Sequence, residues 1–203
     1  MLQGLGRGEK GWKPLKMYHS YLIALGSNLT SGVGTPSETL GAALNCLKNE
    51  GAVIRAVSPL YHTPAFPVGA GPDFVNAAAV LDVDWPAAEV LEVLHRVEAR
   101  MGRERVQRWG QRTLDLDLIG GADLVLPDLQ TYQHWRNLPL EAQIGQAPEQ
   151  LILPHPRLQD RAFVLVPLAD IAPDWIHPVL GLSVAQMLEA LPKADKEAVK
   201  PLQ

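Results

Sequence analysis

The sequence predicts an α+β protein in which helices pack on an antiparallel sheet, in the ferredoxin-like split βαβ arrangement. Three observations support this prediction. Short apolar runs of strand length alternate with segments of helical periodicity in the order strand, helix, strand, strand, helix, strand. Both helical segments carry recognisable start and stop signals. The last strand alternates leucine with aspartate, the two-residue period of a strand whose two faces differ.

The first strand and helix are bounded by residues that favour turns and caps. Residues 21–25 form a short apolar run that is closed by Gly26-Ser27-Asn28, which we interpret as a structural turn. Thr35-Pro36-Ser37-Glu38 has the form of a capping box with proline at the first helical position. Apolar residues follow at helical spacing, and Gly51 is expected to end this helix.

The middle of the chain predicts two strands, a long loop and a second helix. Residues 53–57 read as the second strand, which we expect to continue toward Tyr61. The loop at residues 63–72 is dense in proline and glycine and has a length that suits a lid over a site. Residues 74–83 form the third strand, and a helix with one apolar face follows from Pro86 to Gly102.

The remaining elements begin with the strand that carries the aspartates, at about residues 115–119. We expect this strand to turn at Gly120-Gly121 into a partner strand near residues 123–126. Residues 127–150 are polar and contain proline, so they predict a loop or an irregular helix. Two further helices are expected at residues 163–171 and 183–191.

Length and composition fit one ordinary globular domain. The 203 residues are 47% hydrophobic and 20% charged. We expect residues 1–17 to be a flexible N-terminal extension and residues 18–203 to be a single domain. The net charge of −4 argues against a general nucleic-acid or membrane partner. Cys46 is the only cysteine, which excludes an intrachain disulfide, and the default location is the cytoplasm.

The segment from Arg103 to Asp117 predicts a site for a metal ion and a nucleotide. Asp115 and Asp117 are two apart in a strand, so both carboxylates project to one face. Two carboxylates this close repel each other unless they share a proton or bind a hard cation. Four arginines lie just upstream, and guanidinium groups suit the polyphosphate that such a cation accompanies.

Several motifs together resemble the 6-hydroxymethyl-7,8-dihydropterin pyrophosphokinase family of folate biosynthesis. The resemblance spans about residues 21–191 and depends mainly on one long run, because each shorter motif is weak alone. The motifs are Gly26-Ser27-Asn28-Leu29, Asp73-Phe74-Val75-Asn76, Arg108-Trp109-Gly110-Gln111-Arg112-Thr113-Leu114-Asp115-Leu116-Asp117 and Pro154-His155-Pro156-Arg157. Between Asp117 and His155 the chain is about twenty residues longer than the family pattern, so residues 127–150 are expected to be an insertion.

The resemblance implies an enzyme that moves the β,γ-diphosphate of ATP onto the hydroxymethyl group of the pterin and releases AMP. It implies two Mg²⁺ ions on Asp115 and Asp117, with Arg103 and Arg112 neutralising the phosphates. It also implies ATP contacts and pterin contacts, which fall on separate residues. The ATP contacts are Arg103, Arg105, Arg112, Leu118, His155 and Arg161; the pterin contacts are Thr63, Phe74, Asn76, Trp109 and Phe163.

Other interpretations of the same residues stay open. Asp115 and Asp117 could be the solvated face of an edge strand, and Phe74 and Phe163 could be core residues. The nearest alternative enzyme is a two-metal nucleotidyltransferase or phosphodiesterase, and the nearest non-enzyme is an RNA-binding ferredoxin-like module. The acidic charge and the lack of an RNP-like aromatic run count against that module. The expected partners are ATP and a dihydropterin, and we expect a monomer, although an oligomer fits the sequence too.

Overall fold

The computed structural model describes residues 18–65, 71–102, 113–139, 142 and 145–202. The predicted order of strands and helices is confirmed for the first half of the chain. The elements are β1 (His19–Ser27), α1 (Pro36–Glu50), β2 (Val53–Val57), β3 (Tyr61–Thr63), β4 (Phe74–Val83), α2 (Ala87–Arg100), β5 (Asp115–Gly121), α3 (Leu129–Asn137), the 3₁₀ helix η1 (Leu158–Asp160), α5 (Ala162–Ile171), α6 (Val184–Ala190), α7 (Lys193–Glu197) and β6 (Lys200–Pro201).

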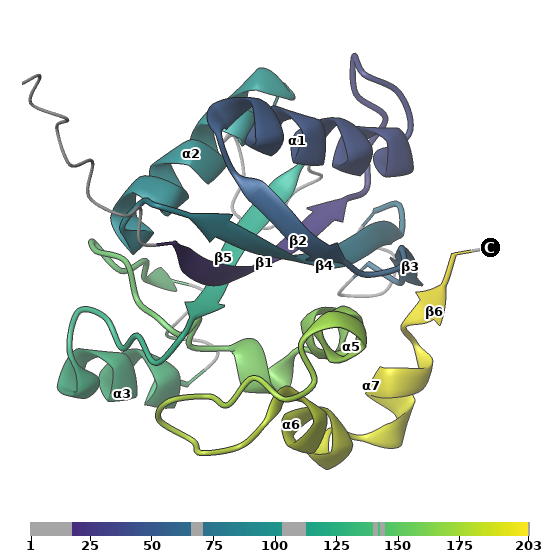
Figure 1. Cartoon of the computed structure of the whole chain (residues 1–203). Helices are drawn as coiled ribbons and strands as arrows, with labels where there is room; N and C mark the ends of the chain where they lie inside the picture. The colour runs from purple at the N-terminus through teal and green to yellow at the C-terminus, as the bar shows by residue number, and fades with distance from the viewer. Residues whose placement is uncertain (1–17, 66–70, 103–112, 140–141, 143–144, 203) are drawn as a thin grey trace, which may run out of the picture.

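The strands form one antiparallel sheet with a layer of helices on each face. The strand order is β5-β1-β4-β3-β6, and β2 pairs with β4 beyond the end of β3. Helices α1 and α2 cover one face of this sheet, whereas α5 and α6 cover the other (Figure 1). The α+β prediction is therefore confirmed.

The first helix begins and ends as its sequence predicts. The hydroxyl oxygen of Thr35 accepts a hydrogen bond from the Glu38 N–H, and the Glu38 carboxylate accepts one from the Thr35 N–H. This reciprocal capping box satisfies backbone donors that the first helical turn leaves unpaired. At the other end Gly51 has a φ of 109°, a left-handed conformation that suits glycine and stops the helix.

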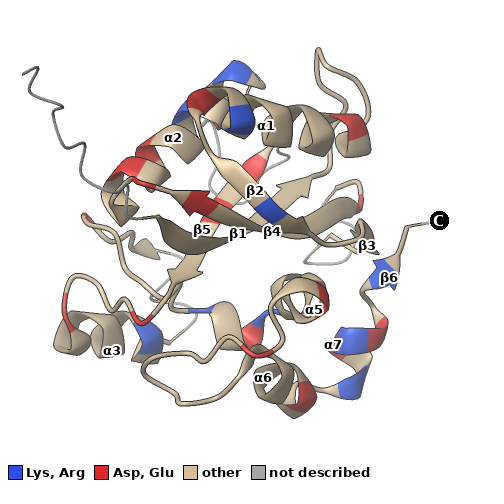
Figure 2. Ribbon diagram, viewed as in Figure 1, with Lys and Arg blue, Asp and Glu red and all other residues tan. Residues whose placement is uncertain are grey.

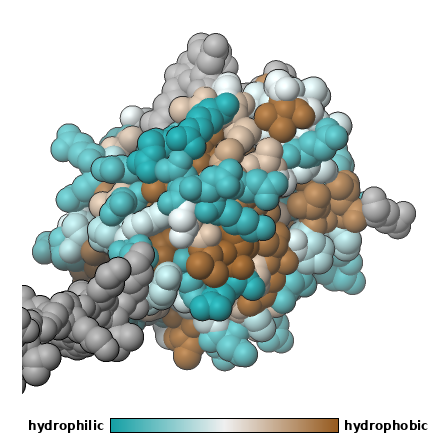
Figure 3. Space-filling view, turned by 45° about the horizontal axis from the view of Figure 1, so that its top comes forward, coloured by the Kyte–Doolittle hydropathy of each residue, from teal (hydrophilic) through white to brown (hydrophobic). Residues whose placement is uncertain are grey.

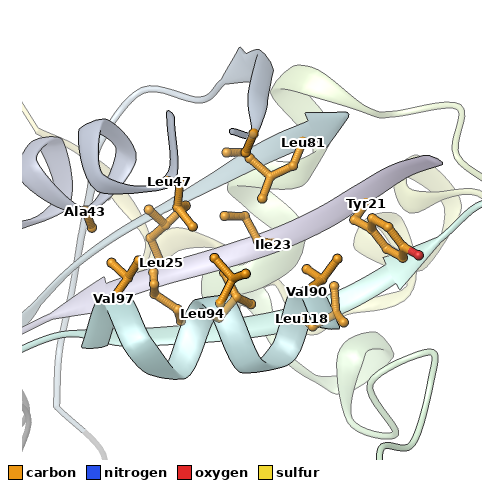
Figure 4. Close-up of a cluster of buried hydrophobic side chains, with 14 of the residues drawn as sticks. Tyr21, Ile23, Leu25, Ala43, Leu47, Leu81, Val90, Leu94, Val97 and Leu118 are labelled. Carbon is orange, nitrogen blue, oxygen red and sulfur yellow. The ribbon is translucent and has the colours of Figure 1, made fainter. Parts of the chain in front are cut away.

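The alternation of leucine and aspartate in β5 separates the core from the polar face. Leu114, Leu116 and Leu118 are buried in the cluster that lies under α1 and α2 (Figure 4). On the other face, Leu22, Ala24 and Ile119 pack against the apolar residues of α5 and α6. The face seen in Figure 3 is mainly hydrophilic with separate apolar patches, so most of the large apolar residues lie between the layers.

Four details differ from the sequence-based expectation. Gly26 lies inside β1, which continues to Ser27, so it is a strand residue and not part of a turn. Residues 123–126 do not form a strand; only an isolated bridge joins Leu126 to Leu153. The expected second strand is interrupted, and β2 and β3 pair with different parts of β4. No sequence pattern predicted the short strand β6.

The segment 127–150 contains a regular helix, α3, which Tyr132 attaches to the rest of the protein. Tyr132 is fully buried and its hydroxyl lies 2.9 Å from Nε2 of the buried His177. Nδ1 of His177 accepts hydrogen bonds from the N–H groups of Val179 and Leu180, so Nε2 carries the proton and the tyrosine oxygen accepts it. Among the helices described, none is long and apolar enough to cross a membrane.

Candidate active site

The candidate site is built on one row of residues that runs across three strands. Asp115 on β5 pairs with Gly26 on β1, and Gly26 pairs with Asn76 on β4. Directly paired residues of antiparallel strands project to the same face. The row therefore places a carboxylate, a bare backbone and an amide side by side on the face that α5 and α6 cover.

The two aspartates project together at the edge of the sheet, as predicted. Both are partly exposed, and the side chain of Asp117 is 37% accessible. The entry into β5 is fixed by Ser27, whose hydroxyl donates a 2.6 Å hydrogen bond to the Thr113 carbonyl. In Figure 2 acidic residues colour part of β5 within the sheet, and other charged residues colour the outer helices.

Gly26, in the middle of this row, lets its bare backbone approach the Asn76 amide closely. A Cβ atom added at Gly26 would lie 2.9 Å from the Oδ1 atom of Asn76 and about 4 Å from the Phe74 ring and the Asp115 Cβ atom. The first distance is shorter than ordinary van der Waals contact, so a side chain here would displace the amide. Sequence analysis treated Gly26 as a turn residue, because only the strand register reveals its neighbours.

Asn76 and Thr63 are joined by a short hydrogen bond. The Asn76 amide nitrogen donates to the Thr63 hydroxyl over 2.6 Å, and both residues are buried. This bond directs the carbonyl oxygen of the amide toward Gly26. Phe74 lies two residues before Asn76 on the same strand and pairs with Thr63, so its ring belongs to the same face. The structure thus brings together three of the predicted pterin contacts.

His155 is held as a neutral ring beside Arg161. Burial, and secondly the positive charge of Arg161, lower the pKa of His155 to about 3. Its Nδ1 atom accepts a hydrogen bond from the Arg157 N–H over 3.1 Å, so Nε2 carries the proton. Nε2 lies 3.5 Å from Nη1 of Arg161. Two donors therefore face each other, an arrangement that favours an acceptor such as a phosphate oxygen between them.

Arg161 is the residue that connects the predicted subsites. Its Nη1 atom lies 3.5 Å from Oδ2 of Asp117, and its guanidinium carbon lies 5.6 Å from the centre of the Phe163 ring. Arg161 caps the start of α5, and Phe163 is the second residue of that helix. One guanidinium group thus lies close to Asp117, the neutral histidine and the exposed aromatic ring.

The remaining predicted residues are not on this face or lie outside the described residues. The Leu118 side chain is 4% exposed and packs in the core under α2, so only its backbone could reach a ligand on the aspartate face. Arg103, Arg105, Trp109 and Arg112 fall outside the described residues.

The two carboxylates can supply some of the ligands of a cation, and the remaining ligands must come from other groups such as phosphate and water. Among the residues that the structure describes, no group of three or more His, Cys, Asp or Glu side chains could hold an ion. Mg²⁺ prefers oxygen ligands and is usually bound by one or two carboxylates together with phosphates and water. The Arg161 guanidinium near Asp117 indicates that this position tolerates positive charge.

Comparisons with known proteins identify the family of this chain. The sequence model described as 7,8-dihydro-6-hydroxymethylpterin-pyrophosphokinase matches residues 22–173. A 2-amino-4-hydroxy-6-hydroxymethyldihydropteridine pyrophosphokinase of Synechocystis sp. is 35% identical over 185 residues, which cover 91% of this chain and 80% of the relative. The enzyme of the same name from Pseudomonas aeruginosa is 36% identical over 177 residues, which cover 87% and 94% of the two chains.

A solved structure shares the fold. The crystal structure of wild-type Plasmodium falciparum HPPK-DHPS superposes with a TM-score of 0.62 at 14% identity, over 87% of this chain and 45% of that longer chain. At this identity the likeness concerns the fold alone. The match of the family model to most of the chain, and the two relatives of similar length, show that this chain belongs to the 7,8-dihydro-6-hydroxymethylpterin-pyrophosphokinase family.

Proposed function

We propose that the face of the sheet between β5 and β3 carries out the family's pyrophosphoryl transfer from ATP to hydroxymethyldihydropterin in folate synthesis. The observation that carries this proposal is the row from Asp115 through Gly26 to Asn76. In this row the carboxylate pair lies between a group of hydrogen-bond donors and a group made of an amide and an aromatic ring. Cationic and neutral donors lie on one side, and an amide with an aromatic ring lies on the other.

The ATP side of the site is formed by Asp115, Asp117, His155 and Arg161. The neutral His155 Nε2–H and the Arg161 guanidinium donate to phosphate oxygens, and Arg103, Arg105 and Arg112 add positive charge. The carboxylates of Asp115 and Asp117 would hold two Mg²⁺ ions, which would lower the charge of the triphosphate and favour deprotonation of the attacking hydroxyl. Leu118 contributes to ATP binding through its backbone.

The pterin side is formed by Thr63, Phe74, Asn76, Trp109 and Phe163. An aminopyrimidinone edge needs a partner that both donates and accepts hydrogen bonds, and the Asn76 amide does both. The aromatic rings of Phe74 and Phe163 provide flat apolar faces for the bicyclic ring. Because the amide is anchored by Thr63, the pterin edge meets a group that is already oriented.

Transfer then depends mainly on position and charge. The pterin hydroxyl attacks the β-phosphorus of ATP, the bond between that phosphorus and the oxygen bridging to the α-phosphate breaks, and AMP leaves with the bridging oxygen. The pterin hydroxyl loses its proton to solvent or phosphate, and the arginines compensate the charge on the transferred diphosphate. The product is the pterin diphosphate.

Product analysis tests this proposal directly. Incubation of the protein with ATP, Mg²⁺ and 6-hydroxymethyl-7,8-dihydropterin should yield AMP and pterin diphosphate in equal amounts. Formation of ADP and a pterin monophosphate would identify an ordinary kinase and overturn the proposal. Chelation of divalent ions should stop the reaction, and added Mg²⁺ should restore it, because the phosphates and carboxylates both need a cation.

The proposal also covers the domain organisation and the oligomeric state of the chain. Residues 18–203 form a single cytoplasmic domain that works as a monomer, preceded by an N-terminal extension at residues 1–17. Residues 127–150 are an insertion that Tyr132 anchors on His177. Size-exclusion chromatography with light scattering tests the monomer, and a mass near twice 22.1 kDa would contradict it.

A further inference from the structure

The C-terminal strand β6 lies at the edge of the sheet next to the pterin side of the site. In Figure 1 it lies next to β3 at the edge of the sheet. Tyr61 pairs with Pro201 and His62 pairs with Lys200. The N–H of Leu202 donates a 2.8 Å hydrogen bond to the carbonyl of Leu60. β6 thus extends the sheet along a strand of only three residues.

The residue just before β6 joins this edge to α5. Val199 is 8% exposed and packs in a small buried cluster with Tyr61 of β3 and Ala162 of α5. The hydroxyl of Tyr61 donates a 2.5 Å hydrogen bond to Asp170 near the end of the same helix. The C-terminal segment therefore contacts β3 through its backbone and the start of α5 through a side chain.

The two elements that meet at β6 carry groups that we propose bind the pterin. β3 carries Thr63, which holds the Asn76 amide, and Ala162 lies between Arg161 and Phe163 in the sequence. Thr63 is two residues from Tyr61, on the same face of β3. A shift of β3 relative to α5 would therefore change the distance between the amide and the Phe163 ring.

We infer that β6 is a positioning element that holds β3 and the start of α5 at the separation the pterin requires. This inference rests on the proposed pterin site. Most of the ATP side depends on β5 and the residues near His155, which do not pair with β6, and only Arg161 adjoins Ala162 at the start of α5. Loss of the β6 contacts should therefore weaken pterin binding more than ATP binding.

Two substitutions at one position isolate the backbone contact. Leu202→Pro removes the N–H that donates to Leu60, and Leu202→Ala keeps it while removing a side chain that is 41% exposed. Leu202→Pro should raise the KM for the pterin by about three- to tenfold, the effect of one net hydrogen bond. The KM for ATP should stay within about twofold, and Leu202→Ala should resemble the wild type.

Val199→Ala tests the packing of Val199 against Tyr61 and Ala162, and it replaces Leu202→Pro as the test if that variant does not fold. It should also raise the KM for the pterin, and by more than the KM for ATP. An unchanged pterin KM in the folded variants, or equal increases for both substrates, would overturn the role of β6. These results are distinguishable from failure of the proposed function, because in that case the wild type itself would form no pterin diphosphate.

Discussion

Arg161 and Asp117 approach to 3.5 Å between Nη1 and Oδ2, so a fixed guanidinium already faces one of the two carboxylates of β5. Both side chains are partly open to water, and an exposed pair of this kind adds little to stability. Its importance lies in the site, because the same guanidinium lies beside His155 and over Phe163. This relationship leads to separate predictions for the carboxylate and for the arginine.

Replacement of either aspartate by asparagine should stop turnover while the fold stays intact. Asp115→Asn and Asp117→Asn keep the side-chain shape but remove the negative charge that we propose binds Mg²⁺. Turnover should fall by about a hundredfold or more, as when a group that stabilises transferring charge is lost. Steady-state kinetics and thermal unfolding measure the two effects.

Asp123→Asn is the matched control for these variants. Asp123 is exposed and lies in the turn after β5, two residues beyond the end of the strand. It should keep wild-type turnover. Near-normal activity of Asp115→Asn or Asp117→Asn at saturating Mg²⁺ would show that the carboxylates do not hold the metal.

Arg161→Met should weaken ATP binding, and Arg157→Met should not. Arg161 faces His155 and Asp117, whereas the neighbouring Arg157 pairs with Asp160 over 3.3 Å. A hydrogen bond to a charged group contributes roughly 1.5–3 kcal/mol, so the KM for ATP should rise by about tenfold or more in Arg161→Met. Titration with a non-hydrolysable ATP analogue measures this directly, and equal losses in both variants would remove the distinction.

Gly26→Ala should impair the pterin side through Asn76. The new methyl group would lie 2.9 Å from Oδ1 of Asn76, so the amide must move or the strands must separate. We expect the pterin KM to rise by about tenfold or more, since a buried polar group left without its partner costs about 1–3 kcal/mol. Gly41→Ala is the control, because a Cβ at Gly41 meets nothing within 4 Å and alanine favours helices. An unchanged pterin KM in Gly26→Ala would contradict the proposed role of the Asn76 amide in pterin binding.

The residues that sequence analysis placed correctly are those with a local signature. The alternation in Asp115-Leu-Asp117 predicts which side chains share a face, because a strand repeats every two residues, and the structure agrees. The capping box at Thr35 likewise needs only four neighbouring residues. Gly26 and β6 carry no such signature. Their neighbours, Asn76 and Tyr61, are brought to them by strand pairing across 50 and 140 positions of the chain.

Stability should decrease in mildly acidic solution because the pKa values of His177 and His155 are lowered in the folded chain. Burial, as the largest cause, lowers the pKa of His177 to about 4, whereas a histidine in an unfolded chain titrates near 6.5. Between these values the unfolded chain binds a proton that the folded ring does not. The free energy of unfolding that this group contributes is therefore complete above about pH 6.5 and is lost as the pH falls toward 4. His155, whose pKa is lowered to about 3, acts in the same direction over a wider range.

His177→Gln should reduce this pH dependence without abolishing it, because His155 remains. Urea unfolding measured between pH 7.5 and pH 4 should show a smaller fall in the free energy of unfolding for His177→Gln than for the wild type. The variant should also be less stable at pH 7.5, since the Tyr132 hydroxyl and the N–H groups of Val179 and Leu180 lose their partner. His134→Gln is the matched control, because His134 is an exposed residue of α3, the helix that Tyr132 anchors. If His177→Gln shows the same fall as the wild type and His134→Gln, protonation of His177 is not what destabilises the folded chain in acid.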